Sequence, residues 1–251
     1  MTATQLNRKV ALAFLAHPDD AEFLCAGTLI RLAKLGWEIR VVTATPGDLG
    51  SATEDQWQIA ARRTAEATRA ASFIGAQYHC LNEQDALVCF DKPTLQKTFD
   101  VFRLIAPSLV FIHAAKDYML DHELVSQLGR AASFAYSIPH ASAHPRHPQS
   151  RIPYLYYCDP IEGIDPLGRL VEPTTWVNIS EQISTKEQML AFHESQRSWL
   201  QEHHGMDEYI DSMKRHAAMR GAQIRVAAAE AFIQHRGHAY PTDDILKTIF
   251  S

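Results

Sequence analysis

Residues 9–16 read KVALAFLA, and residues 17–22 continue as HPDDAE. The first stretch is an almost unbroken apolar run, which is typical of a strand buried on both faces of a parallel sheet. Residues 20–36 then place leucines at roughly helical spacing and end at Gly36, a natural helix stop. The sequence therefore predicts a central strand that runs directly into a helix.

The same alternation continues through the first half of the chain. We expect further strands at residues 38–45, 77–81 and 108–113, and helices at residues 55–74, 93–106 and 121–137. Strands that alternate with helices imply right-handed crossovers and parallel pairing. The expected fold class is α/β, with a Rossmann-like, mostly parallel sheet flanked by helices.

The second half of the chain has a different character. Residues 139–153 hold four prolines and three histidines, which predicts a long irregular loop of the kind that often carries function. Further strands are expected at residues 154–159 and 175–179, and long helices at residues 186–201 and 207–235. Because no linker divides the chain, we expect a single domain over residues 1–251 with a helical C-terminal segment.

Composition limits the classes of function. Lys and Arg number 24 against 29 Asp and Glu, and the resulting net charge of −5 disfavours a protein that binds nucleic acid by neutralising phosphates. No apolar run approaches the length of a membrane span, and the N-terminus lacks the hydrophobic region of a signal peptide. The four cysteines form no CxxC pair, which argues against a disulfide scaffold and against a thiolate zinc site. We expect a soluble, cytoplasmic protein that binds neither nucleic acid nor a membrane.

Two clusters of His and Asp follow strands of the predicted sheet. They comprise His17, Asp19 and Asp20 after the first strand, and Asp117, Asp121 and His122 after the strand at residues 108–113. The carboxyl ends of parallel strands meet at one edge of an open α/β sheet, where ligands bind. Two histidines and one carboxylate can hold zinc with a fourth position open, and ferrous iron suits the same donors. His17, Asp20 and His122 are therefore candidate metal ligands, and Asp19 could face a water molecule on the metal.

A plainer interpretation exists for each cluster. Asp20 and Asp121 could cap the helices that begin there, and His17 could be a partly buried histidine with an ordinary hydrogen bond. The occurrence of two such clusters at the same edge of the sheet favours the metal site.

Several longer motifs accompany these clusters. They are AHPDDAEFLCAGTL (16–29), TPGDLGS (45–51), RRTAEATRAASFIGA (62–76), DYMLDHELVSQL (117–128), YLYYCDP (154–160), and Lys186 with HESQ (193–196). The sequence thereby resembles the PIG-L / LmbE-like family of metal-dependent de-N-acetylases over nearly its whole length. The resemblance implies a Rossmann-like fold and hydrolysis of an acetamido group, usually on an N-acetylglucosamine-type sugar or glycoconjugate. It also implies that His17, Asp20 and His122 hold zinc, that Asp19 is the general base, and that Arg63 lies near the substrate.

One position departs from the family's pattern. Many members read H-x-D-H and use the first histidine to stabilise the oxyanion or to act as an acid, whereas this chain has Met119 there. A thioether can neither donate a proton nor carry charge, so another residue must fill that role. His113, at the end of its strand, is the candidate catalytic residue, and His193 and the histidines of residues 139–153 are others.

The function expected is that of a zinc-dependent hydrolase, in which metal-bound water attacks an N-acetyl amide and Asp19 takes the proton. Its partner would be a small N-acetylated sugar or glycoconjugate, and because relatives often assemble, a homo-oligomer is an open alternative. Met119 motivates a second hypothesis, a non-catalytic, metal-containing glycan-binding protein on the same fold. A third is an amidase for a different acyl group, with its pocket shaped by residues 139–153.

Overall fold

The computed structural model describes residues 9–148, 150–197 and 208–251. Within these residues the centre of the molecule is a seven-stranded sheet in the order β3-β2-β1-β4-β5-β7-β6. The strands are β1 (Val10–Leu15), β2 (Glu38–Thr43), β3 (Gln77–Cys80), β4 (Leu109–Ile112), β5 (Tyr154–Cys158), β6 (Thr175–Asn178) and β7 (Ala229–Gln234). Pairing is parallel from β3 to β5, and β7 lies antiparallel to both β5 and β6. The expected mostly parallel sheet is confirmed.

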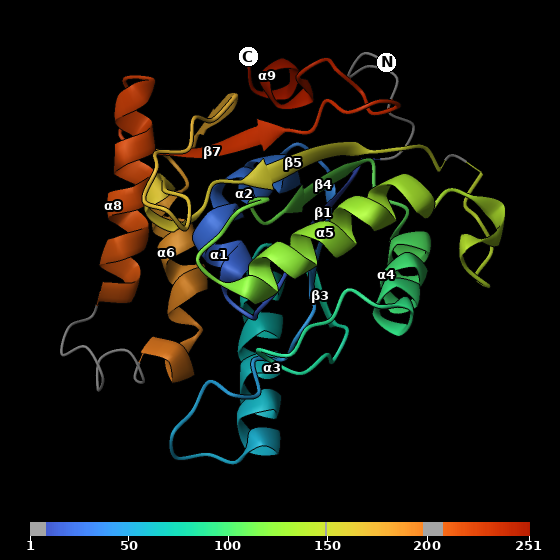
Figure 1. Cartoon of the computed structure of the whole chain (residues 1–251). Helices are drawn as coiled ribbons and strands as arrows, with labels where there is room; N and C mark the ends of the chain where they lie inside the picture. The colour runs from blue at the N-terminus through green and yellow to red at the C-terminus, as the bar shows by residue number, and fades with distance from the viewer. Residues whose placement is uncertain (1–8, 149, 198–207) are drawn as a thin grey trace.

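Helices cover both faces of this sheet (Figure 1). They are α1 (Asp20–Leu24), α2 (Ala26–Lys34), α3 (Gln56–Phe73), α4 (Lys92–Ile105), α5 (Leu120–Ala135), α6 (Ile183–Ala191), α8 (Glu208–Gln223) and α9 (Ile245–Phe250), with short 3₁₀ turns η2 (Pro139–Ala141) and η3 (Ile161–Gly163). α4 and α5 pack together on one face, with α5 against β1, β4 and β5. α2 packs against β2, α3 against β3 and α8 against β7, and α6 contacts all three of these helices. No helix in the described ranges is long and apolar enough to cross a membrane.

Strand β1 lies at the centre of the sheet and is buried along its whole length. Ala11, Ala13 and Leu15 belong to one hydrophobic core, and Leu12 and Phe14 belong to the core on the opposite face. Successive side chains of a strand point to opposite faces, so a strand covered on both sides is apolar at every position. This is the reason that residues 10–15 show no alternation of polar and apolar side chains.

The strand order reverses between β1 and β4. The chain moves from β1 outward to β3 and then crosses to β4 on the other side of β1. The connections that leave β1 and β4 therefore diverge, and the carboxyl edge at this switch point is where open α/β sheets bind ligands. The segment that begins at His17 follows β1, and the segment that ends at His122 follows β4, so the predicted clusters lie on either side of this point.

Residues 207–235 do not form the single helix that their sequence predicts. α8 ends at Gln223, and residues 229–234 form β7, which is inserted between β5 and β6. The segment VAAAEAF (226–232) contains four Ala and one Glu, which favour helices. Pairing with two strands from distant parts of the sequence overrides that preference.

The helix predicted at residues 20–36 is divided in two at Cys25, where the backbone leaves the helical region (φ −144°, ψ 5°). The amides of Gly27 and Thr28 at the start of α2 donate to the buried carboxylate of Glu230, at 2.8 and 2.7 Å. A carboxylate at a helix N-terminus satisfies amides that have no partner within the helix. A side chain of β7 thereby fixes where α2 begins.

Residues 139–153 lie at the wrong edge of the sheet to shape the site. They connect the end of α5 to the start of β5, and so lie at the amino edge of β5. The guanidinium of Arg103 holds them there, because it donates to the carbonyl oxygens of Ile138 and His144 at 2.6 and 3.1 Å. The expectation that this segment forms the pocket for an acyl group is therefore wrong.

A buried ion pair joins α6 to β7. The Lys186 ammonium lies 2.6 Å from the Glu230 carboxylate, and the two side chains are 2% and 3% exposed. We expect Lys186→Met to lower the free energy of unfolding by about 3–5 kcal/mol, because the substitution leaves a buried carboxylate without its counter-charge. Urea denaturation measures this loss.

The exposed pair between Lys214 and Glu187 is a matched control. Its two charged groups are also 2.6 Å apart, but the side chains are 41% and 37% exposed. Lys214→Met should cost less than about 1 kcal/mol, because solvent screens the pair. Equal losses of unfolding free energy in the two variants would show that burial is not the reason that the Lys186 ion pair stabilises the protein.

Candidate metal and active site

In the turn after β1, the adjacent residues Asp19 and Asp20 have side chains with different partners. The Asp20 carboxylate accepts the backbone amide of His17 at 2.7 Å, which closes the turn around Pro18. Asp19 has a left-handed backbone (φ 116°), and its side chain makes no hydrogen bond to the start of α1. A non-glycine residue held in such a conformation costs on the order of 1–3 kcal/mol, and such residues cluster at functional sites.

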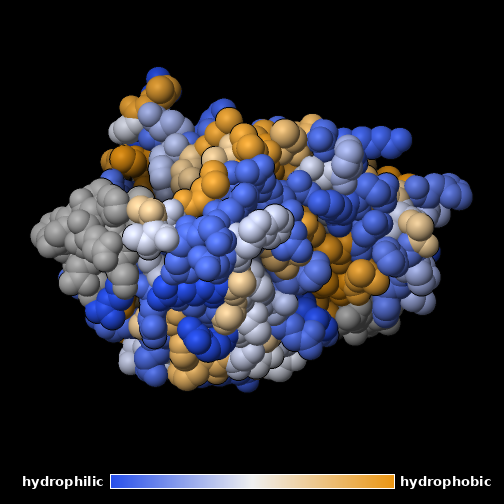
Figure 2. All heavy atoms as spheres, turned by 90° about the horizontal axis from the view of Figure 1, so that it is seen from below, coloured by the Kyte–Doolittle hydropathy of each residue, from blue (hydrophilic) through white to orange (hydrophobic). Residues whose placement is uncertain are grey.

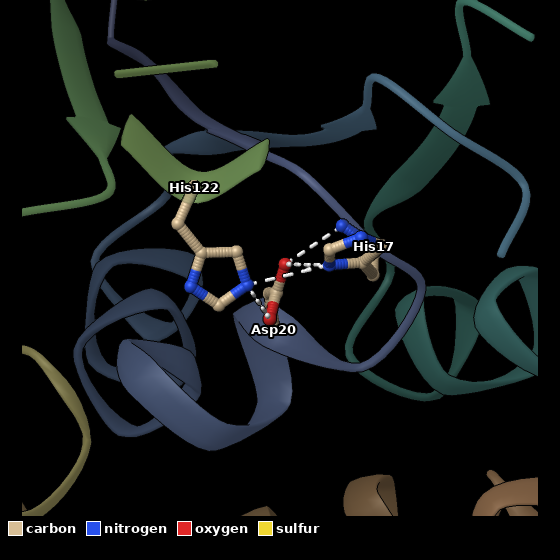
Figure 3. A group of neighbouring side chains, drawn as sticks. All are labelled: His17, Asp20 and His122. Atoms are coloured by element: carbon tan, nitrogen blue, oxygen red, sulfur yellow. Dashed lines mark hydrogen bonds and ion pairs between the residues drawn. The ribbon is translucent and has the colours of Figure 1, made fainter. Parts of the chain in front are cut away.

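Three side chains that could hold a metal ion converge at this turn (Figure 3). The His17 Nδ1 atom lies 3.3 Å from His122 Nε2 and 3.5 Å from Asp20 Oδ2. The second oxygen of Asp20 lies 3.6 Å from His122 Nε2. All three residues are buried, and Asp20 lies between the two imidazole rings. The ligands proposed from the sequence are therefore brought together.

Two further carboxylates orient the imidazole rings. Asp117 lies 2.9 Å from His122 Nδ1, and Asp85 lies 3.1 Å from His17 Nε2. If these carboxylates accept hydrogen bonds from the ring N–H groups, as such partners do in metal sites, His122 Nε2 and His17 Nδ1 are left with lone pairs that face Asp20.

These donors fit a divalent metal ion. Two lone pairs and a carboxylate at such short separations repel one another unless a cation lies between them. Tetrahedral zinc with bonds of about 2.0–2.2 Å holds its ligand atoms roughly 3.3–3.6 Å apart. The two inward nitrogens are 3.3 Å apart, and each lies 3.5 or 3.6 Å from a different oxygen of Asp20, which is close to this spacing.

Among the residues that the structure describes, two other groups of donors lie close enough to hold a metal. They are His113 with Asp117 and His122, and His17 with Asp85 and Asp121. In the first, His113 Nε2 already accepts the backbone amide of Ala16 at 2.9 Å. In the second, Asp121 already accepts the amide of Ala86 at 2.7 Å. In the group formed by His17, Asp20 and His122, one oxygen of Asp20 accepts the amide of His17, whereas its other oxygen, His17 Nδ1 and His122 Nε2 face one another without a backbone partner among the described residues.

His113 lies behind this centre and not on its open side. Its ring is 0% exposed, stacks on His122 with 3.8 Å between the ring centroids, and places Nε2 3.1 Å from Asp20. Burial lowers the pKa of His113 to about 4, so the ring is neutral near pH 7. The role expected of His113, as the acid that replaces the missing histidine, does not fit a ring that a substrate cannot reach. The geometry favours a positioning role toward His122, on which the ring stacks.

Arg63 lies under the loop at residues 45–51. The guanidinium donates to the carbonyl oxygens of Gly47 and Pro18 at 3.2 and 3.1 Å and lies 3.5 Å from Asp19. A Cβ atom on Gly47 or Gly50 would come within 2.2 or 2.6 Å of the guanidinium, so both glycines leave the space that Arg63 occupies. Arg63 was expected near the substrate; the structure places it 4% exposed, in contact with Asp19.

Two sequence motifs hold this loop from behind. Glu66 accepts the backbone amide and the hydroxyl of Ser195, at 3.0 and 2.6 Å. The adjacent Gln196 donates to the carbonyl oxygen of Gly50 at 3.1 Å. Glu66 and the HESQ motif therefore fix the loop that lies over Arg63.

The two adjacent aspartates differ in basicity. Burial raises the pKa of Asp19 above its usual range, although Arg63 and a hydrogen bond from the Tyr209 hydroxyl oppose this. Burial also acts to raise the pKa of Asp20, but His122 and His113 outweigh it and hold that pKa well below the usual range. Separated pKa values in neighbouring carboxyl groups are typical of sites where one group moves protons and the other stays ionised.

Sequence reasoning did not find Asp85 or Tyr209. Asp85 follows β3 at the same carboxyl edge, so its place after a strand was a usable signal. Tyr209 reaches Asp19 from α8, 190 residues further along the chain, and no motif marks it.

The fold and the site together define a Rossmann-like α/β protein with a candidate metal centre at the switch point of its sheet. Residues 12–133 match the model of the family described as PIG-L: GlcNAc-PI de-N-acetylase. This region contains the three candidate ligands and Asp19. Over this region, just under half of its length, the chain is similar to the PIG-L family.

The chain is also similar to two curated proteins of different activity. It is 29% identical to a 4-oxalmesaconate hydratase of Pseudomonas putida over 133 residues, which are 50% of this chain and 52% of the hydratase. It is 36% identical to a 1D-myo-inositol 2-acetamido-2-deoxy-alpha-D-glucopyranoside deacetylase of Rhodococcus opacus over 80 residues, 28% of this chain and 27% of the deacetylase. The matches thus span about half, or less, of these relatives.

Solved structures share the fold over more of the chain. GalB, the 4-carboxy-2-hydroxymuconate hydratase of Pseudomonas putida, superposes with a TM-score of 0.76 at 21% identity and covers 94% of this chain and 100% of its own. The N,N'-diacetylchitobiose deacetylase of Pyrococcus horikoshii gives 0.73 at 20% identity, over 95% of this chain and 89% of its own. At these identities the likeness establishes the fold alone.

Proposed function

We propose that the protein is a metal-dependent hydrolase that removes the acetyl group from an N-acetylated sugar or glycoconjugate. The observation that carries this proposal is the position of Asp19. Its carboxylate has a raised pKa, lies next to the three convergent donors without belonging to them, and is held by Arg63 and Tyr209. Similarity to the PIG-L family and to a deacetylase of a 2-acetamido sugar supports the assignment.

His17, Asp20 and His122 would hold the metal, which we take to be zinc, with ferrous iron suited to the same donors. When bound, such a metal lowers the pKa of water toward about 7 and polarises the amide carbonyl group. Asp19 accepts a proton from the attacking water and gives it to the amine as the C–N bond breaks. One water molecule is consumed, and acetate and a free amine leave.

The negative charge that develops on the amide oxygen needs a hydrogen-bond donor as well. Met119, at the start of α5, cannot donate. The neighbouring Tyr118 is 62% exposed, and its ring packs edge-on against His122 with 5.3 Å between the ring centroids. We infer that the Tyr118 hydroxyl takes this role, because it lies on the accessible side of His122, whereas His113 is enclosed.

Hydration of a carboxylated substrate is a second candidate, because a hydratase is 29% identical over half of the chain. The charge around the centre favours the first candidate. Five aspartates lie at or beside the two ligand histidines, namely Asp19, Asp20, Asp85, Asp117 and Asp121. Arg63 already binds two carbonyl oxygens. Acidic side chains around a site repel a carboxylated substrate but not a neutral amide.

A substrate screen separates these functions. Metal-loaded protein is incubated with N-acetylated monosaccharides, thiol-sugar conjugates and glycosides, and acetate and primary amine are quantified. We expect equal amounts of both from at least one compound. Saturable sugar binding without acetate release would favour a glycan-binding protein. Faster release of longer acyl chains would favour an amidase for a different acyl group. Hydration of carboxylated enols would favour a hydratase.

Tyr209→Phe should move the acid limb of the pH profile of kcat/KM to higher pH. The Tyr209 hydroxyl donates to Asp19 and stabilises the ionised carboxylate, so its removal raises the pKa of Asp19. Because ionised Asp19 is the active form of the base, activity is then lost at a higher pH as the medium is acidified. A limb that stays in place or moves to lower pH would contradict the assignment of Asp19 as the base.

A further inference from the structure

A cavity of about 660 Å³ lies between the loop that follows β2, the first half of α3 and the segment that follows β3. Pockets for small molecules commonly measure about 300–1,000 Å³. Asp48 lines the cavity and accepts the backbone amide of Asp85 at 2.8 Å, and Asp85 in turn lies 3.1 Å from His17. Because these three side chains are buried, they separate the cavity from the candidate metal centre. A ligand in the cavity is therefore a different molecule from one at the metal centre.

One wall of the cavity is a single face of α3. It is formed by Trp57, Ala60, Ala61 and Thr64. Their spacing of three, four and seven residues places them on the same side of the helix. Trp57 is 83% exposed, and the smaller residues that follow it leave open the space beside the indole ring. The wall therefore offers a ligand a large aromatic surface.

The surroundings of this wall are polar. The loop that follows β2 and the start of α3 form the lowest part of the molecule in Figure 1. Figure 2 shows the molecule from below, and the face seen there is mainly hydrophilic. Partner proteins commonly cover contiguous apolar patches. This face instead offers a local aromatic wall, which is suited to a small ligand.

The charge of the lining is negative. Among the described residues that line the cavity, Asp48 and Glu83 are acidic and none is Lys or Arg. Glu83 is paired with Lys97 at 2.6 Å. Asp48 is 7% exposed and accepts hydrogen bonds from neutral amides, those of Gln56 and Asp85, and it forms no ion pair with any described residue. A buried charge is unfavourable unless it is balanced, so the cavity favours a cation.

The chemistry of the lining selects among cations. Both carboxylates are already engaged by donors, and Pro46, Ala60 and Ala61 add apolar surface. A primary ammonium has three N–H groups, each of which needs an acceptor once its water is removed. A quaternary ammonium has no N–H group, and the face of an aromatic ring attracts it, with indole the most effective ring. The lining therefore favours a quaternary ammonium group.

We propose that this cavity binds a small organic cation with a quaternary ammonium group, which packs on the face of Trp57 while the carboxylate of Asp48 balances its charge. The site is separate from the metal centre, and its occupation requires neither a metal ion nor turnover. The inference thus goes beyond the proposed function and does not depend on it.

The test compares choline with its neutral isostere, in which a carbon atom replaces the nitrogen. Calorimetry should show that the wild type binds choline about tenfold more tightly than the isostere. Trp57→Ala should weaken choline binding about tenfold and Trp57→Phe should weaken it less, because a phenyl face attracts a cation less than indole does. Asp48→Asn keeps the shape of the side chain and removes its charge, so it should abolish most of the preference for choline over the isostere.

Two variants and one treatment are matched controls. Phe134→Ala removes a 46% exposed aromatic side chain from α5, and Asp211→Asn removes an exposed carboxylate from α8. Both should bind choline as the wild type does, and so should protein stripped of metal by a chelator. Equal affinity for choline and the isostere, unchanged choline binding in both Trp57→Ala and Asp48→Asn, or loss of choline binding when metal is removed would overturn the proposal.

Discussion

Asp19→Asn should lower kcat for acetate release by about 10²–10⁴-fold, the contribution typical of a general base, while the protein keeps its metal. The side-chain amide has nearly the same shape but cannot accept the proton of water. Asn also tolerates a left-handed backbone, so the turn at φ 116° should survive. Steady-state kinetics together with metal analysis of the same sample measures both properties.

Asp55→Asn is a matched control for this change. Asp55 is exposed and caps α3 by accepting the amides of Trp57 and Gln58, which Asn can also do. Its activity should equal that of the wild type. If Asp19→Asn kept more than a tenth of the wild-type kcat, another residue would be the base, and if it lost the metal, Asp19 would be a ligand.

His122→Ala should bring the metal content close to zero and acetate release to background. The substitution removes one of three donors that lie within 3.6 Å of one another, and the remaining pair cannot hold the ion against water. Metal analysis after dialysis and an acetate assay at saturating substrate measure the two effects.

Asp117→Asn is the informative comparison for His122→Ala. Asp117 only orients the His122 ring, so its loss should weaken metal affinity by about 10–100-fold, and excess metal should restore activity. His122→Ala should not recover in this way. Full metal content in His122→Ala would instead point to the donors formed by His17, Asp85 and Asp121.

The sequence predicts those elements of the fold whose own residue pattern indicates their structure. Residues 10–15 are apolar at every position because β1 is covered on both faces, and His17 and Asp20 follow this strand directly. β7 was not predicted, because the Ala-rich sequence at its start favours a helix and its partners β5 and β6 are distant in sequence. Long-range pairing decided the structure there.

The same distinction holds for the site. The candidate ligands could be predicted because each follows a strand at one edge of the sheet. The burial of His113 next to Asp20 depends on how α5 packs against β1 and β4. The position of His113 in the sequence does not reveal this packing. The hydrogen bond from Tyr209 to Asp19 likewise depends on the packing of α8.

We propose that one metal ion, held by His17, Asp20 and His122, is required for the removal of an acetyl group. The most direct test strips the protein with a chelator, returns metal in steps and measures bound metal and acetate release in each sample. We predict that the stripped protein releases no acetate and that activity rises in proportion to bound metal up to one ion per chain. Acetate release by the metal-free protein, or activity that does not rise in proportion to the one bound ion, would contradict the requirement for this metal.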